Sequence, residues 1–273
     1  VNQAQVVVIS VASGAVISVL EQVGPYLGDV ESLWLTSKGF WQTETEVELL
    51  PEAIKQIAKT KGINLPPLVA IAGPVKASEC ASAKPTATVF ACRDYELAKR
   101  YAKTVTTPNY SVTPSQDEIG VEVCAALKNI YAIALGIADG MSAADEQPRD
   151  NLRAAIFVQA VTEMASLCHA LGGDLQTAYG LAGMGDLQLT STAGRSRLYG
   201  HAVGAGQNPR QALEQMQSQG LTIEGSPAAL IAHQLVQQLG LNAPLLEAVY
   251  QMLHGHVDDA RALICAVALG VDA

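Results

Sequence analysis

The sequence predicts an α/β sheet region followed by an all-helical region, and two changes in pattern indicate this. Up to about residue 112, short β-branched runs alternate with stretches whose apolar residues recur at helical spacing. Such alternation is typical of a sheet whose parallel part is covered by helices on both faces. Beyond Pro114, long stretches rich in Ala, Leu, Gln and Glu replace the valine runs. The segment 112–116 supplies a helix breaker and an N-cap candidate, so we expect domains over 1–113 and 114–273.

The same patterns predict the individual elements. In the first domain we expect strands over 4–11, 32–36, 68–72, 86–91 and 105–112, and helices over 13–23, 50–61 and 95–101. In the second domain we expect helices over 116–138, 151–171, 209–219, 227–239 and 245–253.

Charge and composition argue against several classes of protein. The 273 residues carry 26 acidic and 17 basic side chains, a net charge of −9, which disfavours binding to nucleic acid or an anionic membrane. Apolar runs such as Val6-Val7-Val8-Ile9 are interrupted well before the ~20 residues that span a bilayer, so we expect no membrane protein. The 5 cysteines form no metal-ligand pattern and no export signal opens the chain, which predicts reduced thiols, no metal site and a cytoplasmic location.

The turn after the first strand lacks the glycines of a dinucleotide-binding domain. Such a domain carries Gly-x-Gly-x-x-Gly there and an acidic residue about 20 positions later. Ser13-Gly14-Ala15 has one glycine, and the motif occurs nowhere in the chain. Either the sheet is of another kind, or the first half of such a domain is absent from this chain.

Lys128 is the one lysine in a long apolar helical stretch, and Asn129 follows it. Burying an ammonium group costs several kcal/mol unless a partner or ligand satisfies it, so the pair suggests a site facing a cleft. The alternative is a lysine whose charged end reaches the surface while Asn129 bonds the backbone.

The segment 181–197 combines glycines with Asp186, hydroxyl groups, Arg195 and Arg197. It predicts a flexible loop that brings donors to a phosphate group, because a guanidinium group can donate two parallel hydrogen bonds to phosphate. An ordinary glycine-rich connection with a capping aspartate is the alternative.

Two turns follow predicted strands, Thr36-Ser37-Lys38-Gly39 and Gly73-Pro74. Ligands of open α/β sheets bind at the carboxyl ends of strands, so both turns are placed for a site, although each taken alone is more often structural.

Taken in order, these motifs resemble those of bacterial NAD(P)-dependent glycerol-3-phosphate dehydrogenase. The matching blocks run along essentially the whole chain and comprise Lys38-Gly, Gly-Pro74-x-x-Ala-x-Glu79, Ala-Leu-Lys128-Asn129, Gly-x-Gly-Asp186-Leu-x-Leu-Thr190 and Ile-Glu224-Gly. The resemblance implies reversible reduction of dihydroxyacetone phosphate to sn-glycerol 3-phosphate with NAD or NADP, for glycerophospholipid biosynthesis. It implies a Rossmann-like dinucleotide-binding domain lacking its first ~65 residues. An all-α substrate domain like the C-terminal domain of 6-phosphogluconate dehydrogenase follows it.

The resemblance also implies roles for individual residues. The catalytic residues would be Lys128, Lys38 and Asp186. The substrate-binding residues would be Gly73, Asn129, Thr190, Gly194, Arg195 and Ser196. The cofactor-binding residues would be Lys38, Ala77, Arg195 and Glu224. The expected partner is a small phosphorylated substrate, and a homodimer is possible.

Departures from the family pattern affect the same sites. Val75, Lys76 and Ser78 replace serine, phenylalanine and lysine beside Gly-Pro, and Cys124-Ala125 replaces two glycines before Leu-Lys-Asn. Ser196 stands where asparagine is common. Without the first βαβ unit, strand 4–11 would expose an edge, so we expect poor dinucleotide binding and self-association by this chain alone.

Two other functions remain open. One is a non-catalytic truncated homologue that acts through its helical domain. The other is a related hydroxyacid reductase such as a ketopantoate reductase, which also uses a helix lysine and asparagine but does not explain the Gly-Asp-Leu-x-x-Thr block.

Overall fold

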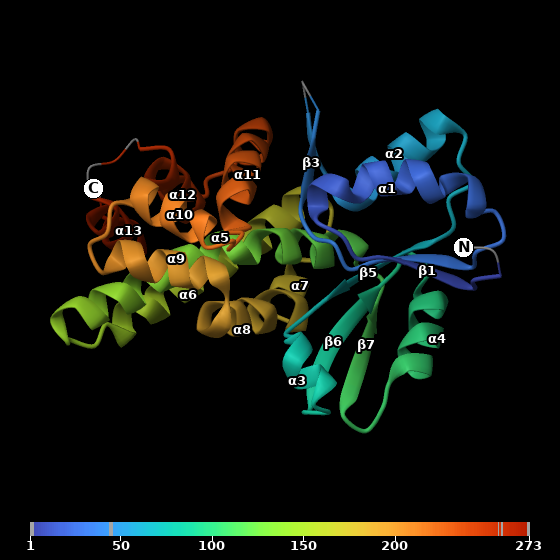
Figure 1. The fold of residues 1–273 in the computed structure, drawn as a ribbon, viewed down its shortest axis with the longest axis horizontal. Coiled ribbons are helices and arrows are strands. Elements are labelled where there is room, and N and C mark those ends of the chain that lie inside the picture. The colour runs from blue at the N-terminus through green and yellow to red at the C-terminus, as the bar shows by residue number, and fades with distance from the viewer. Residues whose placement is uncertain (1–2, 44–45, 256, 258, 272–273) are drawn as a thin grey trace. The chain divides into compact units, whose positions relative to one another are not determined.

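The structure, a computed structural model, describes residues 3–43, 46–255, 257 and 259–271 (Figure 1). The chain forms two compact units. One comprises Val1–Ala126 and Cys168–Gly183, and the other comprises Leu127–Leu167 and Met184–Ala273.

The first unit contains a five-stranded mixed sheet in the order β1-β2-β5-β6-β7. The first three strands in this order are parallel to one another, β6 is antiparallel to β5, and β7 is parallel to β6. β1 forms one edge of the sheet in the described part of the chain, with Val8 51% exposed. The strand bounds are β1 Val6–Ile9, β2 Ser32–Leu35, β5 Leu68–Ala72, β6 Thr86–Ala91 and β7 Tyr110–Ser115.

Helices cover both faces of this sheet, as the alternating pattern predicts (Figure 1). α1 (Val16–Val23) and α2 (Leu50–Lys61) pack their apolar residues on one face, and α4 (Tyr95–Val105) packs on the other. Two separate apolar clusters therefore form the core of the unit. Together with the helices that follow, this sheet confirms the predicted fold class.

The structure differs from the sequence analysis at two places in the first unit. Residues 105–109 are not strand, because α4 continues to Val105, whose side chain packs with Tyr101 and Ala102 against the sheet, and β7 begins only at Tyr110. The hairpin of β3 (Phe40–Gln42) and β4 (Val47–Leu49) was not predicted, because each strand is only three residues long. The remaining elements here are η1 Ser13–Ala15, η2 Gly24–Tyr26, α3 Ala77–Ala81 and α7 Leu175–Ala178.

The second unit is built of helices, as the composition predicts. α5 (Glu118–Asp145) begins in the first unit and continues through the second. It is long and apolar enough to cross a membrane by length and composition, but 94% of its most apolar window is buried, as in the core helix of a globular protein. α6 (Asp150–Ala170) ends in the first unit, and η3 (Leu181–Gly185) begins there. The other helices of the second unit are α8 Asp186–Ala193, α9 Arg195–Gly204, α10 Pro209–Ser218, α11 Gly225–Leu239, α12 Pro244–Leu253 and α13 Ala260–Leu269.

Glycines allow α5 and α9 to touch backbone to backbone. A Cβ atom on Gly200 would lie 2.0 Å from the Ile133 carbonyl oxygen, and one on Gly204 would lie 2.1 Å from that of Ile137. Side chains at these two positions would push the helices apart. The contact fixes the part of α5 that follows Lys128 relative to the second half of α9.

Candidate active site

The central feature of the second unit is an ion pair between Lys128 on α5 and Asp186 at the start of α8. Lys128 Nζ donates a hydrogen bond to Asp186 Oδ2 at 2.5 Å, and the two side chains are 11% and 2% exposed. Two opposite charges removed from water in this way stabilise each other only while both are present. The ammonium group is therefore held at a fixed position near the surface of the unit instead of extending into solvent.

Asn129, Glu224 and Arg195 form a polar row in the same unit. Asn129 Nδ2 donates to Glu224 Oε2 at 2.9 Å, and Arg195 Nη2 donates to Glu224 Oε1 at 3.3 Å. Glu224 directly precedes α11 and Arg195 begins α9, and both side chains are about half exposed. The structure thus brings together Asn129, which is expected to bind substrate, and Glu224, which is expected to bind cofactor. Arg195, expected to bind both, contacts the same glutamate.

The expected loop over 181–197 is wrong, because the segment is helical except at Gly194. Its hydroxyl groups bond back into the helix, with Ser191 Oγ donating to the Gln188 carbonyl oxygen and Thr192 Oγ1 to that of Leu189. Gly194 separates α8 from α9, and a Cβ atom there would lie 2.4 Å from the carbonyl oxygen of Thr190. Gly183 and Gly194 thus allow close approach to carbonyl groups four or five residues earlier in the chain, and they do not mark a flexible loop.

Ser196 lies in the first turn of α9, 2% exposed. Its hydroxyl oxygen accepts a hydrogen bond from the Gly225 N–H at 3.3 Å. This contact attaches the start of α9 to the start of α11, and it holds Arg195 and Glu224 near each other.

A second charged cluster, which the sequence analysis did not predict, surrounds Asp139 on α5. Its carboxylate accepts from Arg153 Nε at 3.1 Å and from Arg197 Nε at 2.8 Å. Arg197 is therefore engaged by Asp139 and, unlike Arg195, is not part of the row with Glu224. The sequence does contain a feature that could have indicated this cluster. Asp139 is a charged residue in the same apolar stretch as Lys128, and such a residue needs a partner of opposite charge.

Thr190, also expected at the site, lies on α8 in the second unit. The remaining expected site residues lie in the first unit, at one edge of the sheet. β1, β2 and β5 are parallel, so the segments that follow them emerge at the same edge. Ser37 ties two of these segments together, because its Oγ donates to the Val11 carbonyl oxygen at 2.6 Å and accepts from the Val11 N–H at 3.1 Å. Lys38 follows directly, and its ammonium group supplies positive charge at this edge.

Gly73 and Ala77 stand after β5 at this edge. Gly73 has φ +145°, and a Cβ atom would lie 3.0 Å from Thr88 Cα, so only glycine fits without strain. Ala77 is the first residue of α3 and is exposed. Gly73 itself is buried, whereas the small exposed residue Ala77 leaves backbone at the start of α3 accessible, which suits a ligand that binds through N–H donors.

Among the described residues, no group of three or more His, Cys, Asp or Glu side chains is placed to bind a metal ion.

Comparisons with known proteins give a consistent result. The profile of the NAD-dependent glycerol-3-phosphate dehydrogenase C-terminus matches residues 117–263, and the profile of the N-terminus matches residues 1–98. The chain belongs to this dehydrogenase family. The Rossmann-like sheet followed by a helical domain that the resemblance implies is that of the family.

Individual relatives show how far the similarity extends. The chain is 32% identical to the NADP(+)-dependent glycerol-3-phosphate dehydrogenase of Archaeoglobus fulgidus, over 93% of this chain and 75% of that protein. It is 36% identical to the glycerol-3-phosphate dehydrogenase [NAD(P)+] of Symbiobacterium thermophilum, over 93% of this chain and 71% of that protein. Among solved structures, glycerol-3-phosphate dehydrogenase from Coxiella burnetii has a TM-score of 0.83 and 31% identity, covering 96% of this chain and 76% of that one.

Proposed function

We propose that this chain interconverts dihydroxyacetone phosphate and sn-glycerol 3-phosphate with NAD or NADP, for glycerophospholipid biosynthesis. The observation that carries the proposal is the Lys128–Asp186 ion pair, at 2.5 Å, in a chain of this family. A largely buried ammonium group with a carboxylate partner is suited to hold and move a proton next to a bound substrate.

The acid–base step falls to Lys128. The nicotinamide cofactor, when bound, supplies or accepts the hydride. As the carbonyl group of the substrate is reduced, the Lys128 ammonium group stabilises the developing alkoxide oxygen and gives it a proton. In the direction of oxidation, the neutral amine takes that proton back. Asp186 Oδ2 holds Nζ in place in both directions.

We assign the phosphate-bearing substrate to residues 114–273, and from the family resemblance alone Gly73 is a further proposed substrate-binding residue. The Arg195 guanidinium group can donate two parallel bonds to a phosphate group, and Asn129 Nδ2 is a second donor beside it. The other proposed substrate residues are Thr190, Gly194 and Ser196, whose helices α8 and α9 hold Arg195 at its position.

We assign the dinucleotide to residues 1–113, at the edge where β1, β2 and β5 end. The donors there fit an anionic nucleotide, because the Lys38 ammonium group offers positive charge and the exposed backbone at Ala77 offers N–H groups. Arg195 and Glu224 are proposed as cofactor-binding residues from the family resemblance alone. Lys38 is the proposed second catalytic lysine.

We propose a cytoplasmic location, supported by five cysteines of which none forms a disulfide in the described residues. Assembly as a homodimer is proposed from the family resemblance alone and is measured by analytical ultracentrifugation.

The substrate is tested by following the oxidation of NADH and of NADPH with a panel of keto compounds. We expect turnover with dihydroxyacetone phosphate and none with ketopantoate or other 2-oxo acids. Preference for a 2-oxo acid would instead favour a hydroxyacid reductase, and binding of glycerol 3-phosphate without turnover would favour a non-catalytic homologue.

A further inference from the structure

Glu224 bonds both of the donors that are assigned to the phosphate group of the substrate. Its Oε2 accepts from Asn129 Nδ2 at 2.9 Å, and its Oε1 accepts from Arg195 Nη2 at 3.3 Å. Each oxygen of the carboxylate therefore engages one of the two donors. A phosphate group also binds a guanidinium group through neighbouring anionic oxygens, so it needs the same N–H groups that the carboxylate already uses.

Two contacts of Gly225 hold Glu224 beside these donors. The Gly225 N–H donates to the hydroxyl oxygen of Ser196, which is buried in the first turn of α9 directly after Arg195. A Cβ atom on Gly225 would lie 2.5 Å from the carbonyl oxygen of Asn129, so the start of α11 lies directly against α5. Because Gly225 directly follows Glu224 in the chain, these contacts keep the Glu224 backbone close to both donors. The carboxylate can rotate, but its backbone stays in place.

The polar row of Asn129, Glu224 and Arg195 carries no net charge in this arrangement. The guanidinium group and the carboxylate cancel each other, and the amide is neutral. The Arg195 and Glu224 side chains are 49% and 59% exposed, so water screens their ion pair and the pair is weak. A phosphate group can therefore displace the carboxylate, but it then meets the repulsion of a negative charge that stays nearby.

We propose that Glu224 is an internal competitor that limits how tightly the site binds the phosphate group of its substrate. While the carboxylate bonds Arg195 and Asn129, a phosphate group must turn it away to make the same bonds. The ligands concerned are phosphate monoesters and free phosphate, because the competition involves the phosphate group alone. This inference rests on the proposed function, in which Arg195 and Asn129 bind the substrate phosphate.

Removing the charge of Glu224 should strengthen the binding of phosphate compounds. In Glu224→Gln the amide keeps the size of the side chain but loses the negative charge that attracts the guanidinium group and repels the ligand. Exposed ion pairs are weak, so we expect a gain in affinity of about two- to fivefold. The gain should shrink as the salt concentration rises, because salt screens charges as exposed as these.

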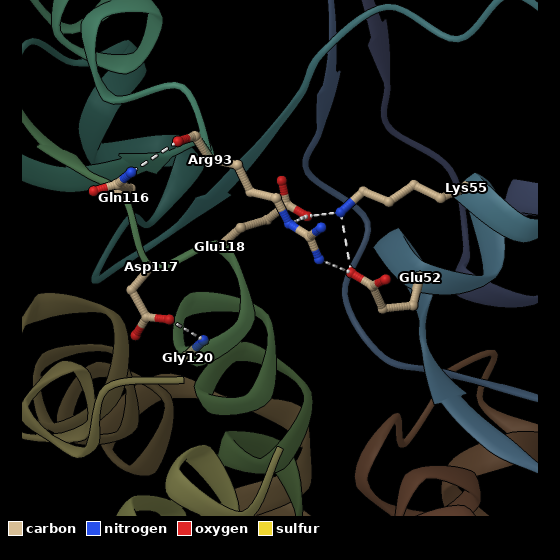
Figure 2. Close-up of polar contacts among 7 residues, drawn as sticks. All are labelled: Glu52, Lys55, Arg93, Gln116, Asp117, Glu118 and Gly120. Atoms are coloured by element: carbon tan, nitrogen blue, oxygen red, sulfur yellow. Dashed lines mark hydrogen bonds and ion pairs between the residues drawn. The ribbon is translucent and has the colours of Figure 1, made fainter. Parts of the chain in front are cut away.

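The test is titration calorimetry without cofactor, using sn-glycerol 3-phosphate and inorganic phosphate with the wild type and with Glu224→Gln. Glu52→Gln is the matched control. In the first unit, Glu52 accepts from Lys55 Nζ at 3.0 Å and from Arg93 Nη2 at 2.7 Å (Figure 2). This variant also removes one negative charge from a glutamate that bonds two donors, but neither donor is assigned to the substrate. Its affinities should equal those of the wild type.

The outcomes separate the inference from the function on which it rests. A gain for both ligands in Glu224→Gln alone, reduced by salt, is the result expected. Unchanged or weaker binding by Glu224→Gln, a gain confined to one ligand, or the same gain in Glu52→Gln overturns the inference alone. Absence of glycerol 3-phosphate binding by the wild type and by Glu224→Gln overturns the proposed function and the inference with it.

Discussion

Lys128 and Asp186 lie 58 positions apart in the sequence and meet at 2.5 Å in the second unit. Two separate features of the fold bring these two side chains together. The packing of α5 against α9 through glycines fixes the helix that carries the lysine, and Asp186 is placed by the start of α8 directly after η3. The pair is therefore sensitive both to its own charges and to the helix packing around it.

Replacing Asp186 with asparagine should affect stability and catalysis together. The amide keeps the shape of the side chain but leaves the buried Lys128 ammonium group without its charge partner. We expect the free energy of unfolding to fall by about 3 kcal/mol and kcat to fall roughly hundredfold. Urea denaturation and steady-state kinetics measure the two effects.

Asp139→Asn is the matched control for that substitution. It weakens contacts with Arg153 and Arg197 on the same unit and leaves the Lys128 pair in place. Stability should fall while kcat stays within a few fold of the wild type. Equal losses of kcat in the two variants would mean that Asp186 has no special relation to the chemistry.

The close contact of α5 with α9 predicts that Gly200→Ala is severely destabilising. The new Cβ atom would lie 2.0 Å from the Ile133 carbonyl oxygen, and backbone must move to accommodate it. We expect a loss of about 3 kcal/mol or more in the free energy of unfolding. Gly28→Ala, where nothing lies within 4 Å of the added atom, should change stability by less than about 0.5 kcal/mol.

Glu163 supports the start of α12 from within the second unit. Its carboxylate accepts from the Leu245 N–H at 2.7 Å, the Leu246 N–H at 3.0 Å and the Tyr131 hydroxyl at 3.0 Å. Glu163→Ala leaves these buried donors without an acceptor, and we expect a loss of about 3 kcal/mol or more by chemical denaturation. A loss no larger than that of the exposed Glu214→Ala would contradict this structural role.

Complete burial raises the pKa of the Glu122 carboxyl group to about 8, which predicts a pH dependence of stability that does not require turnover. The folded state holds this proton up to about pH 8, whereas in the unfolded chain the group titrates near 4.5. The stabilisation from this difference is fully present at acidic pH and is lost as pH rises between those two values. In that window the contribution falls by about 1.4 kcal/mol per pH unit.

Glu122→Gln removes that titration, so its stability relative to the wild type should improve steadily as pH rises to about 8. Urea denaturation of both proteins at several pH values measures this difference. A difference that stays constant with pH would show that Glu122 is already ionised in the folded state.

Much of the fold could be predicted because it depends on local patterns. Strands such as 68–72 and 86–91 are continuous apolar runs, and the structure has strands with the same bounds. The start of β7 could not be predicted, because Val105 is β-branched and favours a strand by composition, whereas its packing beside Tyr101 keeps it in α4.

The candidate site was only partly predictable for a related reason. Motif order drew attention to Lys128 and Asp186, but no local pattern indicates that two residues so far apart in the chain form an ion pair. Glycines at 183, 185 and 194 suggested a loop, and only the structure shows that Gly183 and Gly194 relieve close contacts with backbone carbonyl oxygens. Glu122 was not singled out, because its raised pKa comes from complete burial, which the sequence does not show.

The central claim is that Lys128 is the acid–base group of a glycerol-3-phosphate dehydrogenase. The most direct measurement is kcat for oxidation of NADH or NADPH with dihydroxyacetone phosphate, comparing the wild type with Lys128→Ala and with Lys99→Ala, whose side chain is exposed. We expect kcat to fall about 10²- to 10⁴-fold in Lys128→Ala and to stay near the wild-type value in Lys99→Ala. Turnover by Lys128→Ala within a few fold of the wild type would contradict the account.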